Sequence, residues 1–520
     1  MRNDVLAYVV GLTLMLLVGP LALMIIVGCV LLGEIELTMR SFLLPLAISL
    51  GLGYWLKIWG EKRGASSERL RDREAFAAVA LGWPVIVIIG ALPYWLGGMF
   101  HGPFELISGE SDLFEVLGGY VRAFFESMSG FTTTGATVID PRTSPVCQPS
   151  VPDCINAQGK VHLLWRSLSQ WLGGMGIIML GMLLLARYLG GGMTMARAEL
   201  TGPSLSRLKP RIQQTAKILW GIYAFFTIVE IGLLYYLAGM GLFDAVNHGL
   251  TTLPSGGFST YDAGIMSFNS ATVECIIIVF MILTGINFSL FHYVYRGDWR
   301  AAIKDQEMQV YLAVLTLATL TMTASLYFLA DWEFGSSFRH AIFNVVSIGT
   351  STGYASSNYA IWPTLSLIIL LFLMIVGASA GSTSGGLKIL RLRIAYLLAK
   401  REISRIASPK KIHLVRLNGE VVEDEKLWTI VGMLSWWAVL SMGSIIVLAI
   451  IESSLDLETV ISVAIASLGN TGPALGSFGP TQTWASLHWT SLIITATLMW
   501  LGRLELLTVI VLLSIRVWKE

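Results

Sequence analysis

Four short turns in this sequence carry the residue types that could replace water around a desolvated cation. Each turn follows an apolar run, is rich in Thr, Ser, Asn and Gly, and has a glycine at one fixed place; the turns are 132–136, 254–258, 350–354 and 469–473. Rings of main-chain carbonyls coordinate K⁺ in selective filters. Glycine lets successive carbonyls face one axis because it tolerates a positive φ. Four such turns predict one ion pore.

The predicted ion ligands are the backbone oxygens of these turns, with nearby hydroxyl oxygens. The negative end of each preceding helix dipole would favour a cation at the same place. The candidate filter residues are Thr133, Thr134, Gly135, Ser255, Gly256, Gly257, Ser351, Thr352, Gly353, Asn470, Thr471 and Gly472. A single Thr-Thr-Gly turn would be an ordinary loop, so the prediction depends on the fourfold repetition.

The runs before the turns share a frame although their side chains differ. Nine residues before the four glycines stand Glu126, His248, Asn344 and Val463. This pattern indicates diverged copies of one ancestral unit, which membrane transporters commonly contain.

The composition predicts an integral membrane protein. The chain has 520 residues, of which 54% are hydrophobic and 13% charged, whereas soluble domains average roughly 25% charged. The formal net charge of +1 argues against a nucleic-acid partner. Membrane lipid is the expected surrounding.

Ten apolar runs are long enough to cross a bilayer, which takes about 20 residues. The predicted spans are 5–33, 37–59, 74–99, 160–189, 214–241, 270–293, 308–331, 364–398, 427–452 and 484–514. Four shorter runs fit half-helices that enter and return, at 114–131, 244–254, 337–349 and 457–469. The first span lacks a small-residue cleavage site before the next span and is expected to be retained.

The predicted fold is therefore an all-α integral membrane protein, with two leading helices followed by four units of helix, half-helix, pore loop and helix around a central pore. The expected boundaries are 1–62 for the leading helices, then 63–195, 196–300, 301–415 and 416–520 for the units.

Loop charges predict the orientation, because Lys and Arg concentrate on the cytoplasmic side. The cations are Lys62, Arg63, Arg69, Arg71, Arg73, Arg197, Arg207, Lys209, Arg211, Lys217, Arg296, Arg300, Lys304, Lys400, Arg401, Arg405, Lys410, Lys411 and Arg416. The acids of the loops beside the turns are Glu105, Glu110, Asp112, Asp244, Asp262, Asp331, Glu452, Asp456 and Glu458. The filter is expected to open outward, where these acids either form an acidic vestibule that concentrates cations or merely solvate the loops. Cys147 and Cys154 share one external loop and could form a disulfide there.

Four stretches resemble the TrkH-type membrane subunit of the Trk/Ktr/HKT potassium uptake superfamily. They read FESMSGFTTTGAT at 125–137, SGGFST at 255–260, GASAGSTSGGLK at 377–388 and GRLE at 502–505. The resemblance covers essentially the whole chain. It implies a K⁺-translocating subunit of the bacterial inner membrane that forms a homodimer and works with a cytoplasmic nucleotide-binding (TrkA-like) regulatory ring. It implies K⁺ as the transported ion and no covalently bound cofactor.

The resemblance also implies that glycine at all four turn positions favours K⁺ over Na⁺. Pro254 departs from the family pattern. The glycine-rich segment 377–388 would break its helix, and in the family it forms a loop that crosses the pore as a gate, although small residues also allow close helix packing. The candidate gating residues are Gly377, Gly381, Ser382, Ser384, Gly385, Gly386 and Arg503. The resemblance implies that Arg503 faces the cavity below the filter and raises the barrier to cations there, and Glu505 cannot share its helix face.

Two other function classes compete with a K⁺ pore. A secondary symporter for a small solute, or for Na⁺ with K⁺, would use a broken helix for a midplane site, but this explains only one of the repeated turns. A membrane-embedded enzyme is disfavoured because the sequence has no paired His at helical spacing, nucleophile elbow or P-loop. Three cations lie at the cytoplasmic end of the gate segment: Lys388, Arg391 and Arg393. They either anchor a helix at the headgroups or contact a partner that moves the gate.

Overall fold

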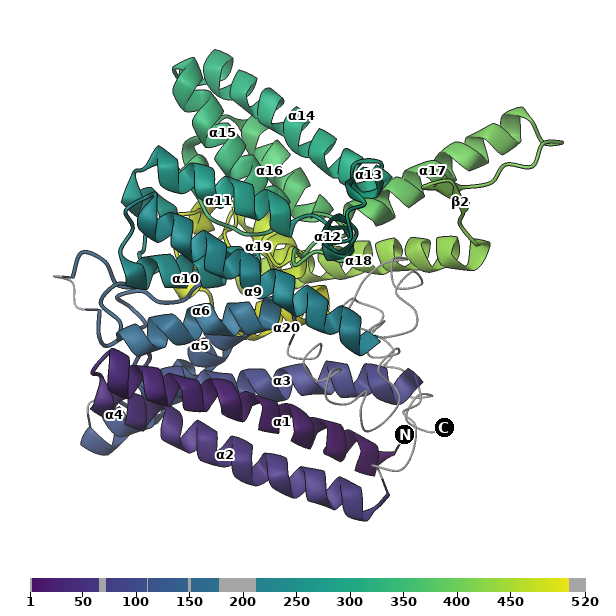
Figure 1. Ribbon diagram of the computed structural model, residues 1–520. Helices are drawn as coiled ribbons and strands as arrows, with labels where there is room; N and C mark the ends of the chain where they lie inside the picture. The colour runs from purple at the N-terminus through teal and green to yellow at the C-terminus, as the bar shows by residue number, and fades with distance from the viewer. Residues whose placement is uncertain (1, 65–71, 110, 148–150, 177–211, 505–520) are drawn as a thin grey trace.

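The computed structural model describes residues 2–64, 72–109, 111–147, 151–176 and 212–504. The predicted residues Glu110, Arg69, Arg71, Arg197, Arg207, Lys209, Arg211 and Glu505 lie outside these ranges, as do the ends of the predicted spans 160–189 and 484–514. The described chain is mostly helical, which confirms the all-α prediction (Figure 1). Its exception is an antiparallel hairpin of β1 (Arg416–Leu417) and β2 (Glu420–Val421).

The two leading helices pack against each other and then against the third. They are α1 (Asn3–Ile26), extended by a π-helical turn Val27–Leu31, and α2 (Ile35–Lys62), and both contact α3 (Asp72–Leu96). Glu34, between the leading helices, accepts hydrogen bonds from the backbone N–H groups of Lys160 and Val161, both at 3.0 Å. A carboxylate there satisfies free donors at a helix N-terminus, so the leading pair is fixed to the rest of the molecule.

The remaining helices follow one repeated order of long helix, short helix, turn and helix. The long first helices are α3, α9 (Ile212–Tyr236), α14 (Gln306–Leu329) and α18 (Asp424–Ile451). The short helices before the turns are α5 (Leu113–Phe131), α10 (Leu242–Thr252), α15 (Phe334–Gly349) and α19 (Leu457–Gly469). The helices after the turns are α6 (Lys160–Gly174), α11 (Ala271–Thr284) with α12 (Phe288–Tyr295), α16 (Thr364–Val376) with α17 (Ile389–Ala407), and α20 (Trp489–Arg503).

Minor elements complete the fold. They are α4 (Pro103–Ser108), α13 (Trp299–Ile303) and short 3₁₀ turns at Gly264–Phe268, Tyr359–Ile361, Gly476–Phe478 and Trp484–Ser486. The four short helices begin and end within a few residues of the predicted half-helices. Five of the described helices are long and apolar enough to cross a membrane, or six if α11 and α12 count as one span.

The predicted span 270–293 is not a single helix. The run 270–293 bends by 92° between α11 and α12. Asn287 begins α12 by accepting the N–H of Ser289 at 2.9 Å, and the carbonyl of Gly285 accepts the N–H of Ser379 at 3.1 Å. The backbone groups freed by the break are thus satisfied from a distant loop, which is how a helix can be interrupted at membrane depth.

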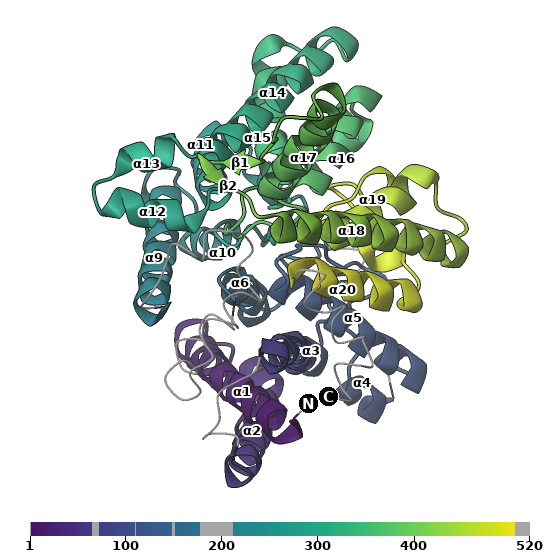
Figure 2. The same cartoon turned by 90° about the vertical axis from the view of Figure 1, so that its right-hand side faces the viewer.

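The two ends of the molecule differ. In Figure 1, α13 and the projecting α17 and hairpin lie toward the right, and α4 lies at the left. Figure 2 looks onto the face from which α17 and the hairpin project. The described cations of the loop 400–416 therefore lie on the face that the charge pattern predicts to be cytoplasmic.

Candidate functional site

The four predicted turns meet in a closed ring. A Cβ atom added to Gly135 would collide with the carbonyl oxygen of Gly256, and one added to Gly257 would collide with that of Thr352. A Cβ on Gly353 would lie 2.7 Å from Pro473 Cδ, and one on Gly472 would lie 2.7 Å from the carbonyl oxygen of Thr134. Each turn therefore touches the next, and the fourth touches the first.

The four turns also share an unusual backbone. The residue two places before each glycine has a left-handed conformation, with φ of 54° at Thr133, 59° at Ser255, 59° at Ser351 and 52° at Asn470. Positive φ is uncommon in non-glycine residues, so its recurrence at one register supports a common element. The turns are buried around their common centre.

The glycines contribute in two ways. Gly135, Gly257 and Gly353 have positive φ, at 86°, 80° and 84°. Gly472 does not, so the prediction that every filter glycine is needed for its backbone angle is wrong there. Position 472 requires glycine for a steric reason, because a side chain there would collide with the first turn.

The turn N–H groups are directed back into the short helices. The N–H groups of Thr134, Gly256, Thr352 and Thr471 each donate to the carbonyl five residues earlier, at 2.8–2.9 Å. Because these donors are satisfied within each unit, the turns leave carbonyl oxygens as the polar groups available to an ion. No cluster of three or more His, Cys, Asp or Glu side chains occurs in the described part of the chain, so these oxygens are the candidate ligands for a cation.

Several predicted ligand groups have other partners, among them the hydroxyls of Thr134 and Thr352, which lie 2.8 Å from those of Thr132 and Thr350. The carbonyl of Gly256 accepts a hydrogen bond from Gln170 Nε2 at 2.7 Å. The side chain of Asn470 donates to Thr134 Oγ1 at 3.1 Å and to the carbonyl of Met499 at 2.8 Å. In contrast, Thr471 Oγ1 is buried without a hydrogen-bond partner.

A hollow lies on the outer side of the ring and is lined by all four turn glycines. Of the described acids named as possible vestibule residues, Asp262 alone is among the lining residues. Others cap helices or bind side chains: Asp112 accepts the N–H of Glu115 at 2.7 Å, and Asp244 accepts the hydroxyl of Thr260 at 2.7 Å. Asp140, which the sequence did not single out, also lines the hollow. Hydrogen bonding to the Arg142 guanidinium lowers the pKa of the Asp140 carboxyl.

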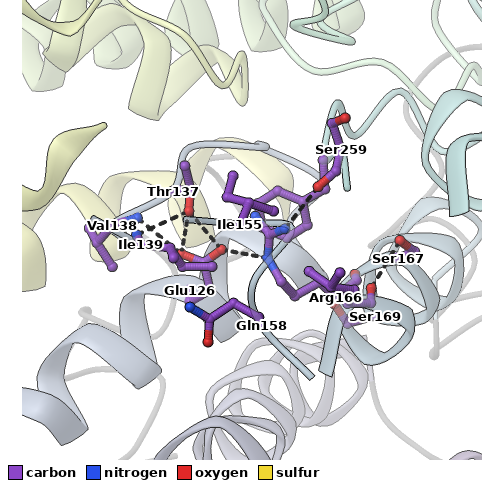
Figure 3. Close-up of polar contacts among 12 residues, drawn as sticks. Glu126, Thr137, Val138, Ile139, Ile155, Gln158, Arg166, Ser167, Ser169 and Ser259 are labelled. Atoms are coloured by element: carbon purple, nitrogen blue, oxygen red, sulfur yellow. Dashed lines mark hydrogen bonds and ion pairs between the residues drawn. The ribbon is translucent and has the colours of Figure 1, made fainter. Parts of the chain in front are cut away.

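A buried ion pair stands beside the hollow (Figure 3). Arg166 Nε lies 2.8 Å from Glu126 Oε1, with 1% and 0% of the two side chains exposed. The carboxylate also accepts the hydroxyl of Thr137 at 3.1 Å and the N–H of Val138 at 3.1 Å. Arg166 donates to the carbonyl of Ser259 at 3.1 Å.

The other residues at the same register serve their own turns. His248 Nε2 lies 3.0 Å from Ser259 Oγ, and Asn344 Nδ2 donates to Ser356 Oγ at 3.1 Å. At the fourth turn Val463 is apolar, and the neighbouring Ser462 accepts the N–H of Leu475 at 3.0 Å instead. Residues at or beside this common position thus hold each short helix to the chain segment that leaves its turn.

The glycine-rich segment 377–388 runs beneath the ring. Thr383 Oγ1 lies 3.0 Å from Ser255 Oγ, and the N–H of Gly385 donates to Ser351 Oγ at 3.1 Å. A Cβ on Gly385 would lie 2.9 Å from Asn470 Cβ. The segment therefore contacts the left-handed residues of three turns.

The candidate gating residues have distinct places in this loop. Gly377, Gly381 and Gly386 have φ of 65°, 76° and 77°, which a non-glycine residue would adopt only under strain. Ser382 Oγ and Ser384 Oγ lie 3.0 Å apart, and Ser384 Oγ accepts the N–H of Ala378 at 3.3 Å. The hydroxyls thus replace helical hydrogen bonds where the helix is broken.

Lys388 and Arg393 both bond to other parts of the protein. Lys388 is buried and donates to the carbonyl of Ser384. Arg393 donates to Gln306 Oε1 at 2.9 Å.

Arg503 joins the loop to a different unit. Its guanidinium donates to the carbonyl of Thr383 at 2.7 Å and to the carbonyls of Gly173 and Gly174 at 2.9 and 2.8 Å. It therefore lies under the ring, on the predicted side of the filter, and is bound to the loop.

Sequence reasoning missed three supporting residues, Arg166, Gln170 and Glu307. Arg166 and Gln170 stand four apart on α6, a spacing that places both on one helix face, and polar groups inside a predicted span were an available signal. Glu307 Oε1 accepts the N–H of Ala380 in the loop at 2.5 Å. Cys147 and Cys154 form the disulfide that the sequence allowed.

Comparison with known proteins identifies the family. The family model TrkH, described as a cation transport protein, matches residues 93–519. The Trk system potassium uptake protein TrkH of Salmonella typhimurium is 33% identical over 515 residues, covering 98% of both chains. The TrkG protein of Escherichia coli is 30% identical over 457 residues, covering 88% of this chain and 87% of that protein.

A solved structure agrees along the whole length. The crystal structure of the potassium transporter TrkH from Vibrio parahaemolyticus matches with a TM-score of 0.82 and 28% identity, covering 100% of both chains. Together with the spanning helices and the ring of turns, these matches show that the chain belongs to the TrkH family of cation transport proteins and is a multi-pass protein of the bacterial inner membrane.

Proposed function

We propose that this protein carries K⁺ into the cell through the ring of four turns. The observation that carries the proposal is the closure of that ring, in which turn 132–136 contacts turn 254–258 and, through Gly472, the last turn. Backbone carbonyls around one axis can replace the hydration shell of K⁺. The relatives TrkH and TrkG are named potassium uptake proteins, which supports K⁺ as the ion.

The segment 377–388 is the proposed gate. Its contacts with Ser255, Ser351 and Arg503 support a position across the inner side of the ring, where an ion leaving the ring would have to pass it. Displacement of the loop would open the path, and Arg503 would hold it closed.

The proposed partner is a cytoplasmic nucleotide-binding, TrkA-like regulatory ring acting on a homodimer of this chain. The name of the Trk system relatives supports a multi-component assembly. The α17 helix and the hairpin β1–β2 project from the body on the cationic face (Figures 1 and 2), where such a partner could reach the helix that follows the gate loop.

Ion flux into proteoliposomes tests the proposal. Purified protein should pass K⁺ and Rb⁺ down their gradients without any organic solute and with little Na⁺. Gly135→Ser should raise the Na⁺ flux relative to Rb⁺. Full K⁺ preference in the serine variant would contradict the filter assignment, and a strict requirement for a solute, Na⁺ or a proton gradient would favour a symporter instead.

A further inference from the structure

We infer that Glu126 and Arg166 form a positioning pair that sets the cation selectivity of the filter by fixing the first turn against the second. The inference rests on the proposed K⁺ pathway and adds a residue pair to its specificity. It concerns buried side chains outside the ring itself.

The pair connects the two chain segments that leave these turns. Thr137 and Val138, which bond to the Glu126 carboxylate, follow Gly135 by two and three residues. Ser259, whose carbonyl accepts from Arg166, follows Gly257 by two residues. The guanidinium thus bridges the exit of the first turn, through Glu126, to the exit of the second (Figure 3).

Arg166 is also fixed from a second direction. Its Cζ lies 4.0 Å from the centroid of the Phe258 ring, an arrangement that favours a cation over an aromatic face. Four residues later on α6, Gln170 donates to the carbonyl of Gly256 at 2.7 Å and accepts the N–H of Phe258 at 3.2 Å. Helix α6 therefore contacts the second turn through both Arg166 and Gln170. Glu126 connects Arg166 to the first turn.

The charge of Arg166 matters because this residue lines the hollow that a cation must enter. A lone guanidinium there would repel K⁺, and Glu126 cancels its charge at 2.8 Å. The pair therefore has two separable roles. Its geometry sets the spacing of carbonyls between two turns, and its neutrality leaves the entrance open to cations.

The two roles predict different effects in three variants. Glu126→Gln removes the carboxylate that neutralises Arg166, so Rb⁺ flux should fall at least fivefold. Arg166→Lys keeps the charge but cannot reach both Glu126 and Ser259 in a planar fork. In this variant Rb⁺ flux should persist while the Rb⁺/Na⁺ flux ratio falls at least fivefold. The neutral double variant Glu126→Gln/Arg166→Gln should recover flux but not the ratio.

The test measures Rb⁺ and Na⁺ uptake in proteoliposomes at matched protein density, with the elution profile in detergent as a check of folding. Arg405→Gln is the control, because Arg405 is 61% exposed and pairs with Glu402 on α17, neither residue lines the hollow, and exposed pairs contribute little. It should keep both flux and ratio within twofold of wild type.

The result that overturns the inference is a wild-type Rb⁺/Na⁺ ratio in folded Arg166→Lys protein. The same ratio in the double variant would overturn it too, and the double variant removes the buried charge that could prevent folding of a single variant. Failure of the proposed function looks different, because wild-type protein would then pass no Rb⁺ at all.

Discussion

Replacing Arg503 should release the gate loop. In the Arg503→Ala variant three hydrogen bonds are lost, to the carbonyls of Thr383, Gly173 and Gly174 at 2.7–2.9 Å. Of these three, the bond to Thr383 belongs to the loop. A hydrogen bond to a charged group contributes about 1.5–3 kcal/mol, so the closed position of the loop should lose about that much.

This free energy sets the fraction of protein molecules in which the loop is displaced. A change of 1.4 kcal/mol is about tenfold in an equilibrium constant, so the ratio of displaced to closed loops should rise roughly 10- to 150-fold. If about 1% of loops are displaced in the wild type, about 10 to 60% would be displaced in the variant. Rubidium uptake at matched protein density should rise by a similar factor, and single-channel records should show the gain in open probability.

The Arg503→Lys variant separates a latch from an electrostatic barrier. Lysine keeps the positive charge but cannot span three carbonyls as a guanidinium can. A latch predicts flux close to that of the alanine variant, and a barrier predicts flux close to wild type. The control is Arg405→Ala, because Arg405 is 61% exposed and pairs with Glu402 on α17. Unchanged or slower uptake in Arg503→Ala would refute the latch.

Two further variants test the ring and the loop. In Gly257→Ala the new Cβ would overlap the Thr352 carbonyl, so Rb⁺ uptake should fall at least tenfold. The control is Gly239→Ala, which is also at positive φ but has open space around it and should retain wild-type uptake. Equal uptake in both variants would count against the ring. In Glu307→Ala the N–H of Ala380 loses its carboxylate acceptor, so the closed position of the loop should be destabilised by about 1–3 kcal/mol. Rb⁺ uptake should then rise roughly tenfold. A wild-type uptake rate in folded protein would show that this bond does not hold the gate.

The short helices and turns could be predicted because their signals are local. An apolar run that ends in a turn with glycine at a fixed place defines both the end of a helix and the backbone that follows. For α19 the predicted range 457–469 is the observed one. The break at 377–388 was equally visible, because clustered glycines and serines destabilise a helix wherever they occur.

The missed features depend on contacts between distant residues. The bend after α11 could not be predicted from a single glycine, Gly285, in an apolar run. It depends on a distant contact, because the carbonyl of Gly285 accepts the N–H of Ser379, far along the chain. Arg166 and Glu126 are 40 residues apart, and nothing in the sequence shows that they pair. The sequence left the acids near the turns as either a vestibule or solvated loop residues, whereas Asp112 caps α5, and capping can be told from solvation only once helix ends are known.

The structure separates the parts that must be alike in the four units from those that are free to differ. The left-handed residue and the five-residue hydrogen bond recur in every turn, because a cation needs oxygens from all sides and backbone groups can supply them equally. The supports outside the ring are free to diverge: on the outer side Glu126 and Arg166 join two turns, and on the inner side Ser255 and Ser351 contact the loop. Selectivity and gating can therefore be changed separately, since they depend on opposite sides of the same turns.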